Sequence, residues 1–238
     1  MFSHTGAERT FRHNIRLAGI LSLTAGLVNV TGFLAFAVLT TNVTGHVASF
    51  AEKLMLQDFS AAFKIGLWML MFLLGAFFSS LFIGRAGRNI RYAYAIPFLV
   101  EAIILFFTGF YSDTISDTAT AFLAGGLLFA MGIQNATVSM ISGSVVRTTH
   151  LTGMFTDLGI ELAEKLQKRY TEKIIIRQKI NLRLVIILFF FAGGISAALL
   201  FPVMKFKTFY VPAALLVFAM FFDMFRASIV HAWNDRKK

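Results

Sequence analysis

The strongest constraint on this chain is a series of apolar segments, each long enough to cross a membrane as a helix. A helix needs about 20 mostly apolar residues to span the hydrocarbon core, where its own hydrogen bonds satisfy the backbone. Hydrophobic residues make up 57% of the chain, more than a soluble domain usually carries. The sequence therefore predicts an all-α, polytopic membrane protein with six transmembrane helices, at about residues 17–39, 62–84, 92–111, 118–143, 182–203 and 208–229.

The basic residues indicate how these segments are oriented. The net charge is +10, and Lys and Arg gather at 1–16, 85–91, 164–183 and 230–238, whereas the connection at 112–117 is acidic. Basic connections stay on the cytoplasmic side, where they lie beside anionic lipid. We therefore expect a cytoplasmic N-terminal segment at 1–16, a basic cytoplasmic loop at 164–183 and a cytoplasmic tail at 230–238. This pattern explains the positive charge without a nucleic-acid partner.

A short motif, T-T-x-[VL]-T-G, occurs twice in the chain, at residues 40–45 and again at 148–153. Each copy follows an apolar segment with a polar group in its middle, N-V-T at 29–31 and N-A-T at 135–137. Two such copies in a chain made mostly of apolar residues indicate a duplicated unit.

The duplication predicts how the two units are related in the membrane. The spacing F-x-x-G at 72–75 recurs at 191–194, which extends the match beyond the motif. The first unit, 17–112, and the second, 113–229, would each contain three spans. Because three is an odd number, the second unit is expected upside-down, as in many secondary transporters. The two copies of the motif would then lie near opposite membrane faces.

The same residues resemble a known family. The first apolar segment followed by Thr44-Gly45, and the sequences at 131–136 and 146–153, are similar to the YoaK-like family of six-helix bacterial membrane proteins. The resemblance covers roughly residues 17–225. It implies a multi-pass protein of the bacterial cytoplasmic (inner) membrane, and it implies no particular reaction.

Polar residues inside the apolar segments are the first candidate site. An amide in hydrocarbon must find hydrogen-bond partners, so these side chains should face the interior of the bundle. One interpretation is a binding site for a small polar solute between the units. The other is that the amides join the first and fourth spans structurally. The residues concerned are Asn29, Thr31, Gln134, Asn135 and Thr137.

The repeated motifs are the second candidate site. We expect Thr44 and Thr152 to be N-caps of the short amphipathic helices that follow, and such helix N-termini attract anions. Alternatively, the hydroxyls only satisfy a broken backbone, which their expected position near the membrane surfaces favours. The candidate binding residues of the two motifs are Thr41, Thr44, Gly45, Thr149, Thr152 and Gly153.

Glu101 is the third candidate, because it lies near the centre of the third span, one helical turn after Pro97. A carboxylate is costly at this depth, and such residues often serve proton or ion pathways. We interpret Glu101 as a proton-coupling group. The alternative is a structural carboxyl that is protonated or paired with a base.

The sequence offers little support for catalysis. It contains no nucleophile motif, P-loop or dinucleotide fingerprint, so we expect neither an enzyme nor a cofactor. Asp157 and Glu161 are simply explained as a polar helix face, and the expected topology separates His46 from His150, so no metal site is predicted. The sequence favours a small secondary transporter or permease for a small polar or anionic solute. A homodimer is expected because each bundle is thin, and a membrane scaffold or assembly protein is the alternative.

Overall fold

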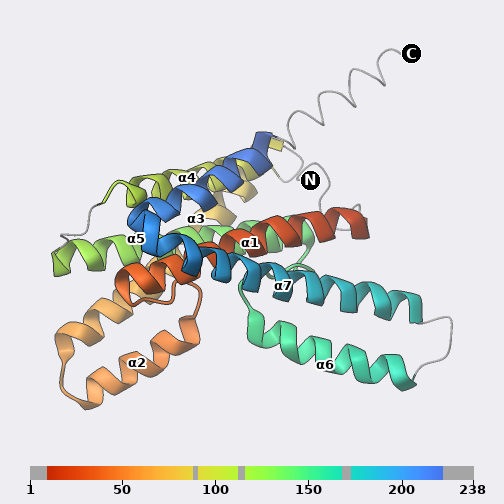
Figure 1. Cartoon of the computed structure of the whole chain (residues 1–238), viewed down its shortest axis with the longest axis horizontal. Helices are drawn as coiled ribbons and strands as arrows, with labels where there is room; N and C mark the ends of the chain where they lie inside the picture. Colours follow the sequence, from red (N-terminus) through yellow and green to blue (C-terminus); the bar gives the residue numbers. More distant parts are fainter. Residues whose placement is uncertain (1–9, 88–90, 112–115, 168–172, 222–238) are drawn as a thin grey trace, which may run out of the picture.

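The structure is a computed structural model, and it describes residues 10–87, 91–111, 116–167 and 173–221. This described part is helical without any strand, which confirms the all-α class (Figure 1). The elements are α1 (Phe11–Phe36), α2 (Val43–Met55), α3 (Phe59–Ala86), α4 (Arg91–Gly109), α5 (Asp117–Ser142), α6 (Leu151–Gln167), α7 (Lys173–Met204) and the 3-10 helix η3 (Lys205–Phe209). A further helix begins at residue 210 and is described to residue 221.

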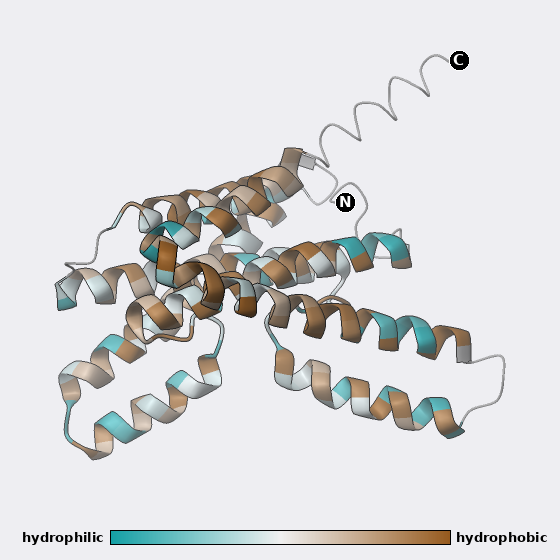
Figure 2. Cartoon of the chain, in the orientation of Figure 1, coloured by the Kyte–Doolittle hydropathy of each residue, from teal (hydrophilic) through white to brown (hydrophobic). Residues whose placement is uncertain are grey.

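Within the described residues, four helical stretches are long and apolar enough to cross a membrane: Phe11–Phe36, Phe59–Ala86, Asp117–Ser142 and Ile174–Phe221. Within α4, Ala93–Gly109 forms a shorter apolar helix. Figure 2 shows hydrophobic residues along the middle of α7, and a mixture of hydrophilic and hydrophobic residues along α2 and α6. These features support a membrane protein, and they confirm that short amphipathic helices follow the first and fourth apolar segments.

The second half differs from the expectation at one place. Much of the predicted loop at 164–183 is helical, because α6 continues to Gln167 and α7 already begins at Lys173. Lys, Arg and Gln are good helix formers, so the charges there do not end a helix. The spans expected at 182–203 and 208–229 belong to one apolar stretch that η3 interrupts, and residues 222–229 lie outside the described part.

The central packing consists of two helix pairs, α1 with α7 and α3 with α5, which share the most extensive contacts in the structure. In the first pair, a Cβ atom on Gly26 would lie 2.1 Å from the carbonyl oxygen of Phe190. A Cβ atom on Gly193 would lie 2.2 Å from the carbonyl oxygen of Leu23. Only glycine permits two helix backbones to approach so closely.

The second pair has the same arrangement. A Cβ atom on Gly75 would lie 2.0 Å from the carbonyl oxygen of Phe129, and one on Gly132 would lie 2.1 Å from that of Phe72. These contacts match Gly75 with Gly193, rather than with position 194 as the sequence comparison had it. The repeat alignment of α3 with α7 that the sequence predicts is therefore wrong by one residue. The sequence could not distinguish the two alignments, because F-x-x-G occurs both at 190–193 and at 191–194.

Burial separates inner from outer helices. Most of α1 and α5 is buried, whereas α3 and α7 expose many large apolar side chains, among them Leu73, Phe77, Leu188 and Leu199. A soluble monomer rarely exposes so much apolar surface, whereas lipid accommodates it. The first group of polar candidates lies on these inner helices: Asn29, Thr31, Gln134, Asn135 and Thr137.

Each inner helix ends in a break. Helix α1 is followed by Ala37 in the left-handed conformation (φ 56°), and α5 by Gly143 in the same conformation (φ 62°). The chain then runs as a short connection into α2 or α6, and each of these short helices packs against the helix that follows it. In Figure 1, α2 and α6 lie on the same side of the central helices, and each forms a hairpin with the helix that follows it, α2 with α3 and α6 with α7.

Candidate functional site

The two repeated motifs meet at one cavity of about 580 Å³. The expectation that they lie near opposite membrane faces is therefore wrong, because the breaks after α1 and α5 both return the chain to this cavity. The lining residues come from both halves of the chain: Asn29, Leu39, Thr41, Asn42, Val43, Thr44, Phe72, Asn135, Thr149, His150, Leu151, Thr152 and Phe190.

The amides of the inner helices make matching hydrogen bonds. Asn29 Oδ1 accepts from the backbone N–H of Thr41 at 3.1 Å and from the Thr41 hydroxyl at 3.0 Å. Asn135 Oδ1 accepts from the Thr149 hydroxyl, and its Nδ2 donates to the carbonyl of Met131 at 2.9 Å. Each asparagine therefore holds the connection that follows its own helix.

This geometry decides against one interpretation of the asparagines. No hydrogen bond links Asn29 or Asn135 to the other inner helix within the described residues, so the amides do not join the first and fourth spans. Gln134 makes that connection instead, because its amide donates to the carbonyl of Leu21 in α1 at 2.9 Å. Gln134 also donates to the hydroxyl of Thr148 at 3.2 Å.

The two short helices begin at the cavity. The N-cap of α2 is Asn42, whose side chain accepts from the N–H of Gly45 at 3.1 Å and from the Thr44 hydroxyl at 2.9 Å. The predicted N-cap role of Thr44 is therefore wrong, and since α6 begins at Leu151, Thr152 also lies inside the first turn. Asparagine is as good an N-cap as threonine, so the sequence alone did not choose between them.

The motif glycines make room for the residues at the cap positions. A Cβ atom on Gly45 would lie 2.6 Å from Nδ2 of Asn42, and one on Gly153 would lie 2.8 Å from Nδ1 of His150. Gly45 and Gly153 thus support the first turns without lining the cavity. The side chains that cap or flank these turns reach the cavity instead.

Six of the predicted binding residues line the cavity: Asn29, Thr41, Thr44, Asn135, Thr149 and Thr152. The other polar candidates on the inner helices do not. The Thr137 hydroxyl is bonded to Ser79 at 2.7 Å, which joins α5 to α3. Thr31 is fully buried, and its hydroxyl has no hydrogen-bond partner in the described part of the chain. These residues, with Gln134, belong to the helix packing around the cavity.

Sequence reasoning missed seven lining residues: Leu39, Asn42, Val43, Phe72, His150, Leu151 and Phe190. Asn42 and His150 occupy the variable position of the repeated motif, which hid their equivalence. Phe72 was noted as part of the repeat, but its counterpart was assigned to the neighbouring Phe191. Matching Gly75 with Gly193 instead of Gly194 would have identified Phe190 as the counterpart of Phe72.

Glu101 lies away from the cavity. It is fully buried in α4, and neither carboxyl oxygen has a hydrogen-bond partner among the described residues. Helix α4 packs mainly against α5 and η3. An effect of Glu101 on the cavity would therefore be indirect, through the helices that α4 contacts, chiefly α5.

The chain matches, over residues 17–222, the family described as "Protein of unknown function (DUF1275)". It belongs to the DUF1275 family. The UPF0700 transmembrane protein YoaK of Bacillus subtilis (strain 168) is 26% identical over 202 residues, which cover 84% of this chain and 89% of that protein. These findings confirm the resemblance to the YoaK-like family. No solved structure matches the chain.

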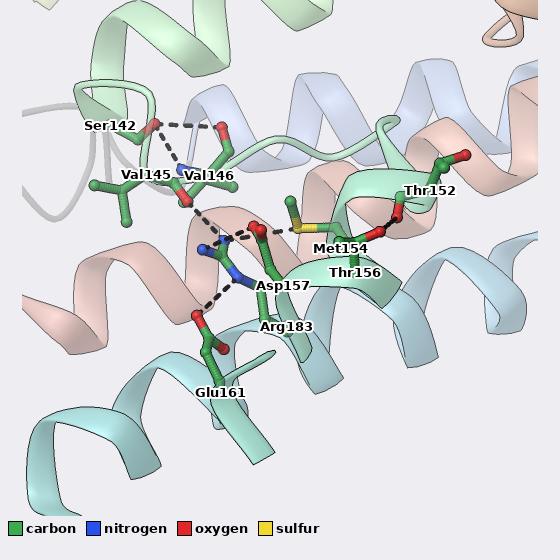
Figure 3. Close-up of polar contacts among 9 residues, drawn as sticks. All are labelled: Ser142, Val145, Val146, Thr152, Met154, Thr156, Asp157, Glu161 and Arg183. Atoms are coloured by element: carbon green, nitrogen blue, oxygen red, sulfur yellow. Dashed lines mark hydrogen bonds and ion pairs between the residues drawn. The ribbon is translucent and has the colours of Figure 1, made fainter. Parts of the chain in front are cut away.

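In this DUF1275 member, an arginine of α7 fixes the position of α6 (Figure 3). Nη2 of Arg183 lies 3.2 Å from a carboxylate oxygen of Asp157, and Nε lies 3.4 Å from one of Glu161. Nη1 donates to the carbonyl of Val145, in the connection before α6, at 3.3 Å. Burial raises the pKa of Glu161, and the charge of Arg183 partly offsets this effect. Arg183 thus ties both α6 and the connection that leads to it onto α7.

In this DUF1275 member, α2 is held by a histidine and a tryptophan, whereas α6 is held by ion pairs. His46 lies 2.9 Å from the carbonyl of Leu39, so its Nε2 must carry the donated hydrogen. The His46 ring packs edge-on against Trp68 of α3, with 6.0 Å between the ring centroids. Trp68 Nε1 in turn donates a hydrogen bond to the carbonyl of Ala121 in α5 at 2.9 Å. His46 is therefore a buried structural residue beside the cavity.

Proposed function

We propose that the protein is a small secondary transporter or permease that moves a small polar or anionic solute through the central cavity. The observation that carries the proposal is the cavity itself, to which each half of the chain contributes an Asn of its inner helix and two Thr of its motif. Its volume of about 580 Å³ is in the range of small-molecule sites, commonly about 300–1,000 Å³. A scaffold would have no need for a cavity into which these Asn and Thr side chains project.

The proposal includes six spans arranged as two inverted three-helix repeats. The glycine contacts support it, because the α1–α7 and α3–α5 pairs use the same spacing and the same backbone atoms. The asparagine–threonine bonds after α1 and α5 support it as well. Transporters with inverted repeats commonly bind their solute between the repeats, often beside interrupted helices.

Glu101 enters the proposal as a proton-coupling group that acts through the packing of α4 on α5. We further propose that the protein lies in the bacterial cytoplasmic membrane with both termini inside. Its basic segments would contact anionic lipid there, and two copies would form a homodimer. The carboxyl of Glu101 supports coupling because it is buried without a described partner.

Flux measurements on purified protein in liposomes test this function. Small anions, cations and neutral metabolites would be offered with and without a pH gradient, using wild type, Asn135→Ala and Glu101→Gln. We expect Asn135→Ala to lower flux at least tenfold, since it removes the bond that fixes Thr149 at the cavity. Glu101→Gln should remove the dependence on the pH gradient.

Asn181→Ala is the matched control, because Asn181 is exposed on α7 and lies outside the cavity. It should transport like wild type. Absence of flux for every solute class, from protein shown to be folded and inserted, would contradict the proposed function. Equal loss in Asn181→Ala and Asn135→Ala would show that the loss reflects folding, and would contradict the role given to Asn135.

A further inference from the structure

The charge around the cavity defines the kind of solute that fits. The described lining residues include no Asp, Glu, Lys or Arg. The fixed electrostatic contribution therefore comes from the N-termini of α2 and α6, which both begin at the cavity with Val43 and Leu151. A helix N-terminus carries roughly +0.5 of an elementary charge, so two amount to about one positive charge.

The first turns also supply hydrogen-bond donors. In the described part of the chain, no hydrogen bond uses the backbone N–H of Val43 or Thr44 in α2, or of Leu151, Thr152 or Gly153 in α6. Such N–H groups have no partner within their own helix and normally bind water, side chains or ligands. Donors from two sides of a cavity suit an acceptor group with two equivalent oxygens.

Asn29 gives a second, independent indication of a ligand. The backbone N–H of Thr41 can only donate, so the atom it contacts is the oxygen of Asn29, and the amide nitrogen is thereby identified. This nitrogen has no acceptor among the described residues, although Asn29 is only 9% exposed and lines the cavity. This donor is open to the cavity, so an acceptor group that binds there can take its hydrogen bond.

The walls of the cavity are apolar and aromatic. Phe72 of α3 and Phe190 of α7 both line it, each three residues before a glycine that brings the helices into contact. Leu39, Val43 and Leu151 add further apolar surface. If an inorganic anion bound here, the apolar lining of the cavity would stay exposed to water. A planar organic group would instead cover that lining by packing against the aromatic rings.

We propose that the solute is a small organic monocarboxylate with a planar apolar body. Its carboxylate binds the first turns of α2 and α6 and the amide of Asn29, and its body packs against Phe72 and Phe190. This inference rests on the proposed function and specifies its substrate class. A dianion such as phosphate is disfavoured because the lining has no Lys or Arg to balance a second charge.

Calorimetric titration of the purified full chain in detergent tests the inference with benzoate as the probe. Benzamide has nearly the same shape without the charge, acetate has the charge without the body, and inorganic phosphate carries a second charge. We expect benzoate to bind at least tenfold more tightly than each of the other three. Asn29→Ala should weaken benzoate binding at least tenfold.

Phenylalanine variants test the position of the apolar body. Phe190→Ala should weaken benzoate but leave the weak binding of acetate unchanged. Phe191→Ala is the matched control, because Phe191 is 52% exposed on the outer surface of α7. If Phe190→Ala does not fold, Phe72→Leu tests the opposite wall, since Phe72 is only partly buried.

The outcomes separate this inference from the proposed function. Equal binding of benzamide and benzoate, or tighter binding of phosphate, would overturn the substrate class. Benzoate binding that survives both Asn29→Ala and the phenylalanine variants would show that the site lies elsewhere. Flux of a cation or sugar without benzoate binding would overturn the inference and leave the transporter standing. A chain that moves no solute at all would refute the transporter itself.

Discussion

The hairpins α2–α3 and α6–α7 begin at the same cavity and yet are held together by different chemistry. In the first, His46 and Trp68 pack edge to ring, and Trp68 bonds to a carbonyl of α5. In the second, Arg183 forms ion pairs with Asp157 and Glu161. The backbone plan is shared, whereas the side chains that fasten each short helix are not.

The difference indicates which features the architecture requires. Close helix contact at Gly26, Gly75, Gly132 and Gly193 occurs in both halves and involves backbone atoms, so a side chain has no room there. The contacts that hold each short helix against its neighbour differ between the halves: they are aromatic for α2 and ionic for α6. The two hairpins should therefore respond alike to changes at the glycines and differently to changes in charge.

The largest effect is expected at the glycines. Gly26→Leu and Gly132→Leu both place side chains against carbonyl oxygens of the partner helix, and overpacking of this kind typically costs about 1–3 kcal/mol, with more expected against rigid backbone. Each variant should lose the monodisperse peak on size exclusion in detergent. Gly84→Ala and Gly159→Ala are controls, because nothing lies within 4 Å of their Cβ positions. Loss in only one half would contradict the equivalence of the two pairs.

An intermediate effect is expected at Arg183. Arg183→Met leaves the Glu161 carboxyl buried without its partner, and breaking a buried ion pair costs up to about 3–5 kcal/mol. Because Asp157 is partly exposed, we expect a loss below this range and smaller than that of the glycine variants, measured as a lower Tm in detergent. Lys64→Met, at an exposed position on α3, should leave the Tm unchanged. Adding Glu161→Gln should recover part of the loss, and an unchanged Tm in Arg183→Met would refute the anchoring role.

The smallest effect is expected in the aromatic hairpin. Trp68→Phe removes the hydrogen bond to Ala121 but keeps an aromatic ring, and a typical hydrogen bond contributes about 1 kcal/mol. The Tm should fall slightly, by less than in Arg183→Met. Phe63→Leu, at an exposed aromatic position on the same helix, should not change it. A loss larger than that of Arg183→Met would show that the hydrogen bond from α3 to α5 contributes more to stability than the ion pairs of Arg183.

Local patterns allowed much of the fold to be predicted. The apolar segments marked the long helices, and the polar positions Asn29 and Asn135 marked the inner ones. The meeting of the two motifs could not be predicted, because a break after an apolar segment looks the same at a membrane surface and inside a bundle. Only the backbone contacts distinguish them.

The site was predicted in part for a related reason. The threonines and asparagines stood out against an apolar background, whereas Phe72 and Phe190 belong to it. The run of phenylalanines at 189–191 with glycines at 193–194 fits two registers, and a shift of one residue turns a side chain by about 100° around a helix. The repeat counterpart of Phe72 was therefore taken as Phe191, which faces outward, and neither Phe72 nor Phe190 was predicted to line the cavity.

The pairing of α1 with α7 has a consequence for biosynthesis. The ribosome delivers α1 first and α7 after α6, so the inner helix must wait for its main partner while the intervening chain is made. A polar side chain in α1 would be exposed to lipid during that time at a considerable cost. Asn29 avoids part of this cost because its oxygen bonds to Thr41, only 12 residues later, which emerges almost at once. The local bond thus protects an early helix until α7 arrives to pack against it.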